Sequence, residues 1–236
     1  MTKKTKRVKH DAYLTTPEVA AAVVEDVLRT VEGRPAMLSS RETLSALEPS
    51  AGEGAFVTAL LDAQQAGAST RYTKVAAVEP REKAMRKLWL HLPHPRLTLY
   101  RTTFEEFATA HSLAFFDLVI GNPPFSYAEK HIQLARERGR WVAFLLRLSM
   151  LGSQRRASTL WSQPGLYSVR PLARRPAFIR PGKPLRSDNS EYGIFLWQFA
   201  VIYALALGAA AVHLLGSLLL TIAGIKSVTI FLATHA

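Results

Sequence analysis

Four consecutive residues after an apolar run have the types and the order that are needed to hold an amine. Asn122, Pro123, Pro124 and Phe125 follow the run at 116–120, with Gly121 between. Two prolines stiffen the chain and prevent the strand from continuing, so the side-chain carbonyl of Asn122 and the backbone carbonyl of Pro123 keep fixed directions. Each carbonyl can accept a hydrogen bond from an NH2 group, which turns the nitrogen lone pair toward an incoming methyl group. The tetrad therefore predicts methyl transfer to an amine.

Phe125 indicates which kind of amine this is. An aromatic side chain can stack on a ring that carries the amine, as it does where an enzyme extrudes a base from its stack. An Asn-Pro-Pro sequence also occurs in ordinary turns. Its position at the end of a buried run and before an aromatic residue favours the functional interpretation, with Asn122 as the main catalytic candidate.

A second motif, at 48–56, has the composition of a turn that a ligand approaches closely. Gly52 and Gly54 allow backbone contacts that a side chain would prevent. The motif lacks the complete dinucleotide fingerprint and the Gly-Lys-Ser/Thr of a P-loop, so it does not support phosphate binding. Its acidic residues suit a cationic ligand such as S-adenosylmethionine, which carries a sulfonium and an amino group. Taken alone, however, the motif fits a plain structural turn better.

Glu79 ends the next apolar run, at 74–78. A carboxylate in this place can accept hydrogen bonds from both ribose hydroxyls of a nucleoside. The segment between it and the glycine motif is somewhat longer than the roughly 20 residues of dinucleotide-binding folds, and the loop at 66–72 can absorb the difference. As an isolated acid Glu79 would be ordinary surface charge, but the glycine motif before it makes it a ligand candidate.

Strands and helices alternate between 16 and 147. We expect strands at 44–47, 74–78, 97–100, 115–120 and 141–147, and helices at 16–32, 55–63, 81–90, 103–109 and 127–137. This alternation predicts an α/β fold, with a doubly wound, mostly parallel sheet that helices cover on both faces. Ligands bind at the carboxyl ends of such strands. Both motifs fall at such ends, so we expect them to form one site.

The charge of the chain fits a polyanionic partner. Lys and Arg total 30 against 18 Asp and Glu, which gives a net charge of +12 and a pI of about 10.2. We expect a disordered basic arm at 1–10 and a loop-rich basic flap at 153–189, where Arg174 and Arg175 are weak candidates for substrate contacts. Ordinary solvated surface is the alternative explanation of both segments.

The chain contains no cysteine. This excludes disulfides, thiolate metal sites and cysteine nucleophiles, and it agrees with a reducing compartment. We expect no metal in the site and a cytoplasmic protein.

The last part of the chain, at 199–236, is an apolar tail that we expect to be helical. No Asp, Glu, Lys or Arg occurs between 192 and 225, and roughly 20 apolar residues suffice to cross a bilayer. Three interpretations remain open: a membrane anchor through 199–225, an out-of-frame or chimeric gene end, and a buried pair of helices. The basic residues before the tail favour its N-terminal side in the cytoplasm.

The motifs together resemble those of the adenine-specific DNA methyltransferase family, in particular its phage-type members. The segment at 13–17, the glycine motif, Glu79 and the Asn122 tetrad stand in the family's order. The resemblance covers roughly residues 11–197, and we expect the methyltransferase domain at 11–198. It implies a Rossmann-like methyltransferase domain that uses S-adenosylmethionine. The implied substrate is the exocyclic amine of adenine in double-stranded DNA, with the base flipped out. We expect a monomer.

The resemblance also assigns residues to the cofactor and to the target base. Tyr192 resembles an aromatic residue that helps to hold the flipped base. The implied cofactor contacts are Tyr13, Thr15, Thr16, Pro17, Glu48, Pro49, Ser50, Ala51, Gly52, Gly54, Phe56 and Glu79. Pro17 is also a suitable first residue of a helix.

The chain departs from the family at two places. Members often carry an acid before a phenylalanine after the third strand, where this chain has Thr103 before Phe104; Glu105 or Glu106 could compensate. The apolar tail is the second departure. Alternative functions are methylation of an RNA base or of a glutamine amide in protein. A membrane-attached, catalytically inactive nucleic-acid-binding protein is a further alternative.

Overall fold

The computed structural model describes residues 13–32, 44–63, 72–91, 94–180, 182 and 184–199. The chain divides into a unit that ends at Gln198 and a second that begins at Phe199. The basic arm at 1–10 and nearly all of the apolar tail lie outside the described residues, so both remain expectations. Within the ranges given above, no helix combines the length and the apolar character that a membrane span requires.

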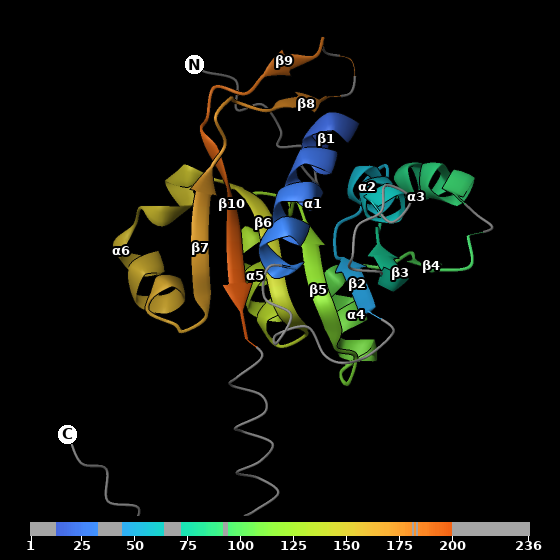
Figure 1. Ribbon diagram of the computed structural model, residues 1–236, viewed down its shortest axis with the longest axis horizontal. Coiled ribbons are helices and arrows are strands. Elements are labelled where there is room, and N and C mark those ends of the chain that lie inside the picture. The colour runs from blue at the N-terminus through green and yellow to red at the C-terminus, as the bar shows by residue number, and fades with distance from the viewer. Residues whose placement is uncertain are drawn as a thin grey trace, which may run out of the picture. The chain divides into compact units, whose positions relative to one another are not determined.

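A seven-stranded sheet forms the centre of the first unit (Figure 1), in the order β4-β3-β2-β5-β6-β10-β7. The five strands from β4 to β6 run parallel, and β10 is antiparallel to both β6 and β7. The strands are β2 (Leu44–Glu48), β3 (Tyr72–Val78), β4 (Leu97–Tyr100), β5 (Phe116–Gly121), β6 (Gly139–Arg147), β7 (Leu166–Pro171) and β10 (Tyr192–Gln198). The strand order reverses between β2 and β5, where such folds bind their ligands.

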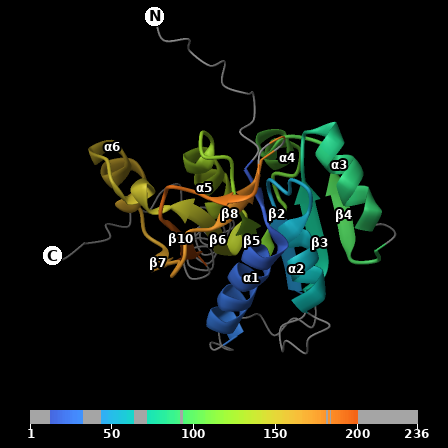
Figure 2. The same ribbon diagram turned by 90° about the horizontal axis from the view of Figure 1, so that it is seen from above.

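Helices cover both faces of this sheet. Figure 2 shows α1 and α2 on one face and α4 and α5 on the other. The helices are α1 (Pro17–Glu32), α2 (Ala55–Ala63), α3 (Glu82–Leu88) with the 3₁₀ turn η2 (Trp89–His91), α4 (Phe104–Ala110) and α5 (Ala128–Arg136). The apolar positions of α1 recur every three or four residues, so a single face of the helix is buried.

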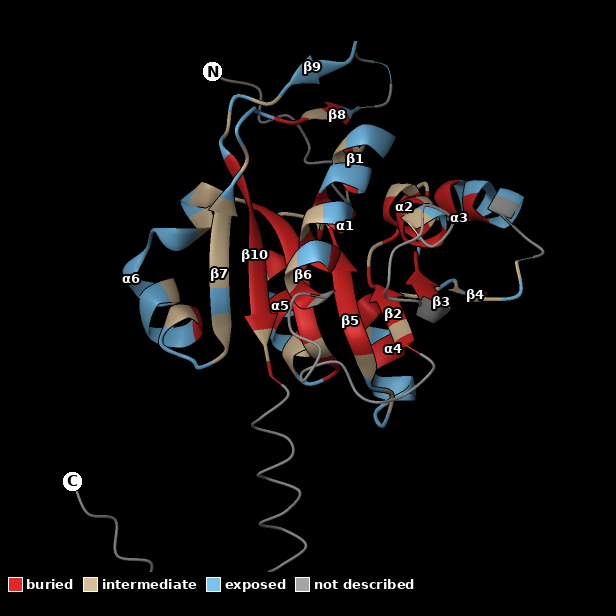
Figure 3. Ribbon diagram, viewed as in Figure 1, coloured by how far each residue is buried: buried red, intermediate tan, exposed pale blue. Residues whose placement is uncertain are grey.

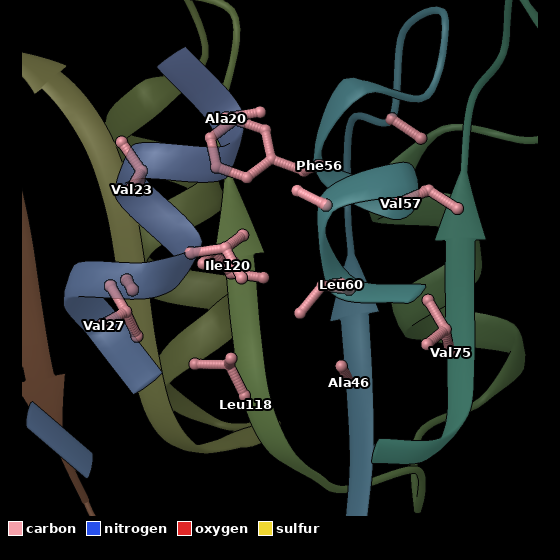
Figure 4. Close-up of a cluster of buried hydrophobic side chains, with 14 of the residues drawn as sticks. Ala20, Val23, Val27, Ala46, Phe56, Val57, Leu60, Val75, Leu118 and Ile120 are labelled. Carbon is pink, nitrogen blue, oxygen red and sulfur yellow. The ribbon is translucent and has the colours of Figure 1, made fainter. Parts of the chain in front are cut away.

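The main core lies between α1, α2 and the sheet. Val27 of α1 and Leu60 of α2 point toward Leu118 and the neighbouring apolar residues of the strands (Figure 4). The middle strands β5, β6 and β10 are almost entirely buried (Figure 3). Their near-continuous apolar sequence therefore reflects a sheet that is covered on both faces.

The helices and strands predicted between 16 and 147 are confirmed, with small shifts at their ends. The helix expected at 81–90 is divided into α3 and η2, and the strand expected at 141–147 begins at Gly139. Each of these elements has its own apolar periodicity and its own turn residues, which is why the sequence indicates it directly.

The segment at 153–189 differs from the loop-rich flap that its composition predicts. It contains β7, which pairs with β10 at the edge of the main sheet. The 3₁₀ turn η3 (Leu148–Leu151) precedes the segment. Within it, the short helix α6 (Gln154–Arg156) leads into the π-helical turn η4 (Ala157–Trp161), and the strands β8 (Ala177–Ile179) and β9 (Arg186–Ser187) form a hairpin. Its strands are short or only half-buried, so they lack the continuous apolar run that marks the central strands.

A second sheet, of three strands, joins the segment before α1 to the hairpin before β10. The short strand β1 (Leu14–Thr15) pairs antiparallel with β8, which pairs antiparallel with β9. This sheet lies near the carboxyl ends of the central strands, at the top of Figure 1. It therefore fixes the chain around Tyr13 and Thr15 beside the Asn122 tetrad.

Candidate active site

A cavity of about 430 Å³ lies where β1 and the carboxyl ends of β2, β3 and β5 meet. It brings together most of the predicted site residues. Those that line it are Tyr13, Thr15, Pro49, Ser50, Ala51, Gly52, Phe56, Glu79, Asn122, Pro123, Pro124 and Phe125. The glycine motif, Glu79 and the tetrad therefore form one site, as the sequence predicts.

Asn122 has one half of its amide bound and the other half without a partner. Its Nδ2 donates to the Thr15 hydroxyl at 3.1 Å and to the Tyr13 backbone carbonyl at 3.5 Å. Its Oδ1 is buried and accepts no hydrogen bond from the described residues. A buried carbonyl without a donor is costly. The arrangement is explained if a ligand supplies the missing donor.

The turn between β2 and α2 depends on its two glycines. Gly52 has a φ of +57° and Gly54 a φ of +97°, in the left-handed region that favours glycine. The turn is closed by a hydrogen bond from the Gly54 amide to the Ala51 carbonyl, at 2.9 Å. The backbone at 49–52 thereby forms one wall of the cavity.

Glu79 is buried, with 2% of its surface exposed. Its Oε2 accepts from the Gly52 amide at 2.8 Å, and its Oε1 accepts from the Arg81 amide at 2.8 Å. The Arg81 side chain adds two further bonds, from Nε to Oε1 at 2.8 Å and from Nη2 to Oε2 at 3.2 Å. Arg81 also lines the cavity, so it is a site residue that the sequence analysis missed.

Glu48 lies outside the lining of the cavity and packs against Gly121. Its Oε1 accepts from the Ser50 amide at 3.2 Å, whereas its Oε2 has no partner in the described part of the chain. A Cβ on Gly121 would come within 2.6 Å of the Glu48 carboxyl carbon. Burial, with a smaller contribution from the charge of Glu79, raises the pKa of Glu48 to about 8. Glu48 is therefore mostly neutral at pH 7.

The raised pKa of Glu48 predicts that the protein loses stability as the pH rises from about 4.5 to about 8. Below about pH 4.5 both the folded and the unfolded chain keep this carboxyl protonated, and between 4.5 and 8 only the folded chain does. The contribution of Glu48 to stability is thus lost as the pH rises toward 8, by a few kcal/mol. Because Glu48→Gln keeps a neutral side chain, we expect its free energy of unfolding to fall less between pH 5 and 8. Urea titrations of both proteins measure this, and parallel pH profiles would contradict it.

Thr103, which follows β4, lines the far end of the cavity. Thr103 begins α4 in a capping box: its hydroxyl accepts from the Glu106 amide, and the Glu106 carboxylate accepts from the Thr103 amide. Glu106 is therefore engaged in the cap, and Glu105 is a second acid that lines the cavity. His131 lines the same end, and burial lowers its pKa, so it is neutral. The sequence contains no signal for His131, because only the packing of α5 on α4 brings it here.

Other predicted contacts lie elsewhere. Thr16 and Pro17 form the start of α1, where the Thr16 hydroxyl accepts from the Val19 amide at 3.4 Å. Arg175 is paired with Glu191 at 2.7 Å, and Arg174 is exposed. The cavity lining does not include these four residues, Glu48, Gly54 or Tyr192.

Tyr192 is buried, with 1% of its surface exposed. Its ring lies 5.9 Å from that of Phe125, between centroids. The structure thus places it beside the tetrad rather than in the cavity. In the ranges that the structure covers, no cluster of His, Asp and Glu could hold a metal ion.

The chain matches no sequence family and no curated protein, but it is similar to solved structures. A candidate RNA methyltransferase from Pyrococcus horikoshii superposes with a TM-score of 0.59 at 18% identity, over 83% of this chain and 91% of that one. A candidate class I S-adenosylmethionine-dependent methyltransferase from Listeria monocytogenes gives 0.54 at 15%, over 83% and 63%. The precorrin-6y C5,15-methyltransferase from Geobacter metallireducens gives 0.52 at 16%, over 81% and 93%. At these identities the likeness establishes a Rossmann-like methyltransferase fold.

Proposed function

We propose that the chain is an S-adenosylmethionine-dependent methyltransferase that acts on the exocyclic amine of adenine in DNA. The observation that carries the proposal is the buried Oδ1 of Asn122, which has no donor among the described residues. It belongs to a residue that lines the cavity and that Thr15 holds by its other amide atom. An amine is the group that supplies the missing donor.

The residues of the cavity fit S-adenosylmethionine. Its volume of about 430 Å³ is in the range of small-molecule sites. Glu79 would hold the ribose hydroxyls, and the turn at 49–52 would lie against the rest of the nucleoside and the methionine part. The acidic residues Glu53, Glu79 and Glu105 line a site for a ligand with cationic groups. When bound, the cofactor supplies a methyl group on a positively charged sulfur.

The chain's own contribution is positioning. Asn122 Oδ1 and the Pro123 carbonyl accept the two N–H bonds of the amine, so that its lone pair points at the methyl donor. The same two oxygens stabilise the positive charge that develops on the nitrogen. Phe125 stacks on the ring. A general base before attack is unnecessary, because the amine can lose its proton after methylation.

The charge of the chain supports a nucleic acid rather than a protein as the substrate. The net charge of +12 suits a polyanion, and a glutamine amide in a protein would not need it. RNA bases are the second candidate, since a neighbour in fold is described as an RNA methyltransferase. We place DNA first because the ordered motifs resemble the DNA enzymes.

The test is methyl transfer from labelled S-adenosylmethionine to unmethylated DNA, RNA and protein in parallel. We expect label in DNA. Label only in RNA would redirect the proposal to an RNA enzyme, and label only in protein would refute the nucleic-acid substrate. Absence of label together with absence of cofactor binding in calorimetry would refute the methyltransferase itself.

Arg81→Ala is expected to strengthen cofactor binding. The Arg81 side chain makes two bonds to the carboxylate of Glu79, which the ribose hydroxyls need as acceptor. Removing this half-buried ion pair should lower the Kd for S-adenosylhomocysteine by roughly three- to tenfold, about 1 kcal/mol. Calorimetry measures the change, with Arg86→Ala, an exposed arginine of α3, as control. Weaker binding by Arg81→Ala would mean that the guanidinium contacts the cofactor instead.

A further inference from the structure

Four aromatic rings pack together beside the cavity. Neighbouring ring centroids lie 5.1–6.1 Å apart. The members of this aromatic cluster are Tyr13, Phe125, Phe178 and Tyr192, which come from the segment before β1, from the tetrad, from β8 and from β10. Tyr13 and Phe125 also line the cavity. The cluster therefore borders the place where the target amine has to arrive.

Arg147, the last residue of β6, lies over the ring of Phe125. Its guanidinium carbon is 4.1 Å from the ring centroid. Two anchors hold it there: Nε donates to the Tyr192 hydroxyl at 3.0 Å, and Nη2 donates to the Asp188 carboxylate at 3.1 Å. The Tyr192 hydroxyl in turn donates to Asp188 at 2.8 Å. The planar cation is thus stacked on the aromatic residue of the tetrad.

The anchors are in the right charge state for this arrangement at neutral pH. Burial raises the pKa of Tyr192, which keeps its hydroxyl protonated as a donor. Burial alone would raise the pKa of Asp188, but hydrogen bonds from Tyr192 and Arg147 outweigh it and hold the pKa below its usual range. Arg147 therefore lies between a phenol and a carboxylate, and the ion pair is intact when no base is bound.

A ring and this guanidinium cannot share the same face of Phe125. The distance of 4.1 Å is a stacking contact, so no base fits between them. Tyr13 also covers Phe125, at 5.2 Å, but its carbonyl accepts from Asn122, so its displacement would disturb the catalytic amide. The Arg147 side chain is 30% exposed. It is the neighbour that can leave Phe125 without moving Asn122.

By the proposed function, the target ring stacks on Phe125; we propose that Arg147 is a placeholder on this face of Phe125. Arg147 occupies this face in the free protein, and the target ring displaces it. The inference rests on the proposed function and narrows it. A glutamine amide has no ring to stack and needs no such exchange, whereas a nucleobase does.

The test measures the binding of adenosine to protein saturated with S-adenosylhomocysteine, which blocks the cofactor cavity. Because adenosine is uncharged, loss of the positive charge of Arg147 removes no ion pair with it and does not weaken its binding. We expect Arg147→Ala and Arg147→Lys to bind adenosine roughly three- to tenfold more tightly than the wild type, because neither stacks as a guanidinium does. Tyr192→Phe removes one anchor and should give a smaller gain. Arg86→Ala, on the exposed side of α3, is the control and should not change the affinity.

Thermal unfolding of each variant confirms that it is folded, and the conservative Tyr192→Phe keeps the test open if Arg147→Ala is unstable. Absence of S-adenosylhomocysteine binding by the wild type would refute the proposed function and the inference with it. Normal binding of that ligand, with adenosine held no more tightly by any of the three variants, would refute the inference alone.

Discussion

Replacement of Asn122 by alanine is expected to lower kcat for methyl transfer roughly 100- to 1000-fold, the usual effect of removing one preorganised hydrogen-bonding group from a reacting centre. The reason is the loss of Oδ1, the buried acceptor that has no other partner in the described residues. Cofactor binding should change much less than kcat, because the bonds of the Asn122 amide go to Thr15 and Tyr13 at one end of the cavity and none reaches Glu79 or the glycine turn. Initial rates at saturating cofactor, with calorimetry of S-adenosylhomocysteine, separate the two effects.

The matched control for Asn122→Ala is Ser126→Ala. Ser126 directly follows the tetrad and is exposed, so its loss should leave both kcat and cofactor affinity unchanged. An Asn122→Ala protein that keeps its kcat, or loses cofactor binding to the same extent as activity, would show that Asn122 is structural.

Replacement of Gly121 by alanine is expected to lower the free energy of unfolding by about 1–3 kcal/mol, as overpacking of a core does. The new methyl group would meet the Glu48 carboxyl, which has 1% of its surface exposed and cannot move into solvent. The open space near Glu48 is the cavity lined by Pro49 and Ser50. A displaced carboxyl would enter it, so the affinity for S-adenosylhomocysteine should fall as well.

Two comparisons make the Gly121 prediction specific. Gly152→Ala is the control, because the nearest atom to a Cβ there is 3.7 Å away; we expect less than about 0.5 kcal/mol of change. In the double variant Glu48→Ala/Gly121→Ala the clash is absent, so its loss of stability should be smaller than the sum of the single losses. Urea titrations measure the wild type and all four variants, and strict additivity would contradict the proposed packing.

The sequence predicts the catalytic motif and its surroundings because both depend on local order. The prolines after Asn122, the glycines after Glu48 and the acid at the end of β3 each follow an apolar run, and parallel strands bring the ends of such runs together. Every strand from β2 to β6 has such a run, so the centre of the sheet could be predicted as well.

What the sequence could not indicate depends on contacts between distant segments. Leu14 pairs with Ile179 in a sheet of short strands, and neither segment has a periodicity that indicates this. Arg147 ends an apolar strand as any surface arginine would, and only the meeting of β6, β10 and the tetrad places it over Phe125. Arg81 looks like the first residue of a helix, and its bonds to Glu79 follow from the bend of the chain after β3.

The most direct test of the central claim is to identify the atom that receives the methyl group. Unmethylated DNA is incubated with the wild-type protein and labelled S-adenosylmethionine, digested to nucleosides and separated by chromatography with mass detection. The account predicts N6-methyldeoxyadenosine as the labelled product, absent with Asn122→Ala and present with Ser126→Ala. Label on a cytosine, on a ribonucleoside from an RNA control alone, or on the protein itself would contradict it.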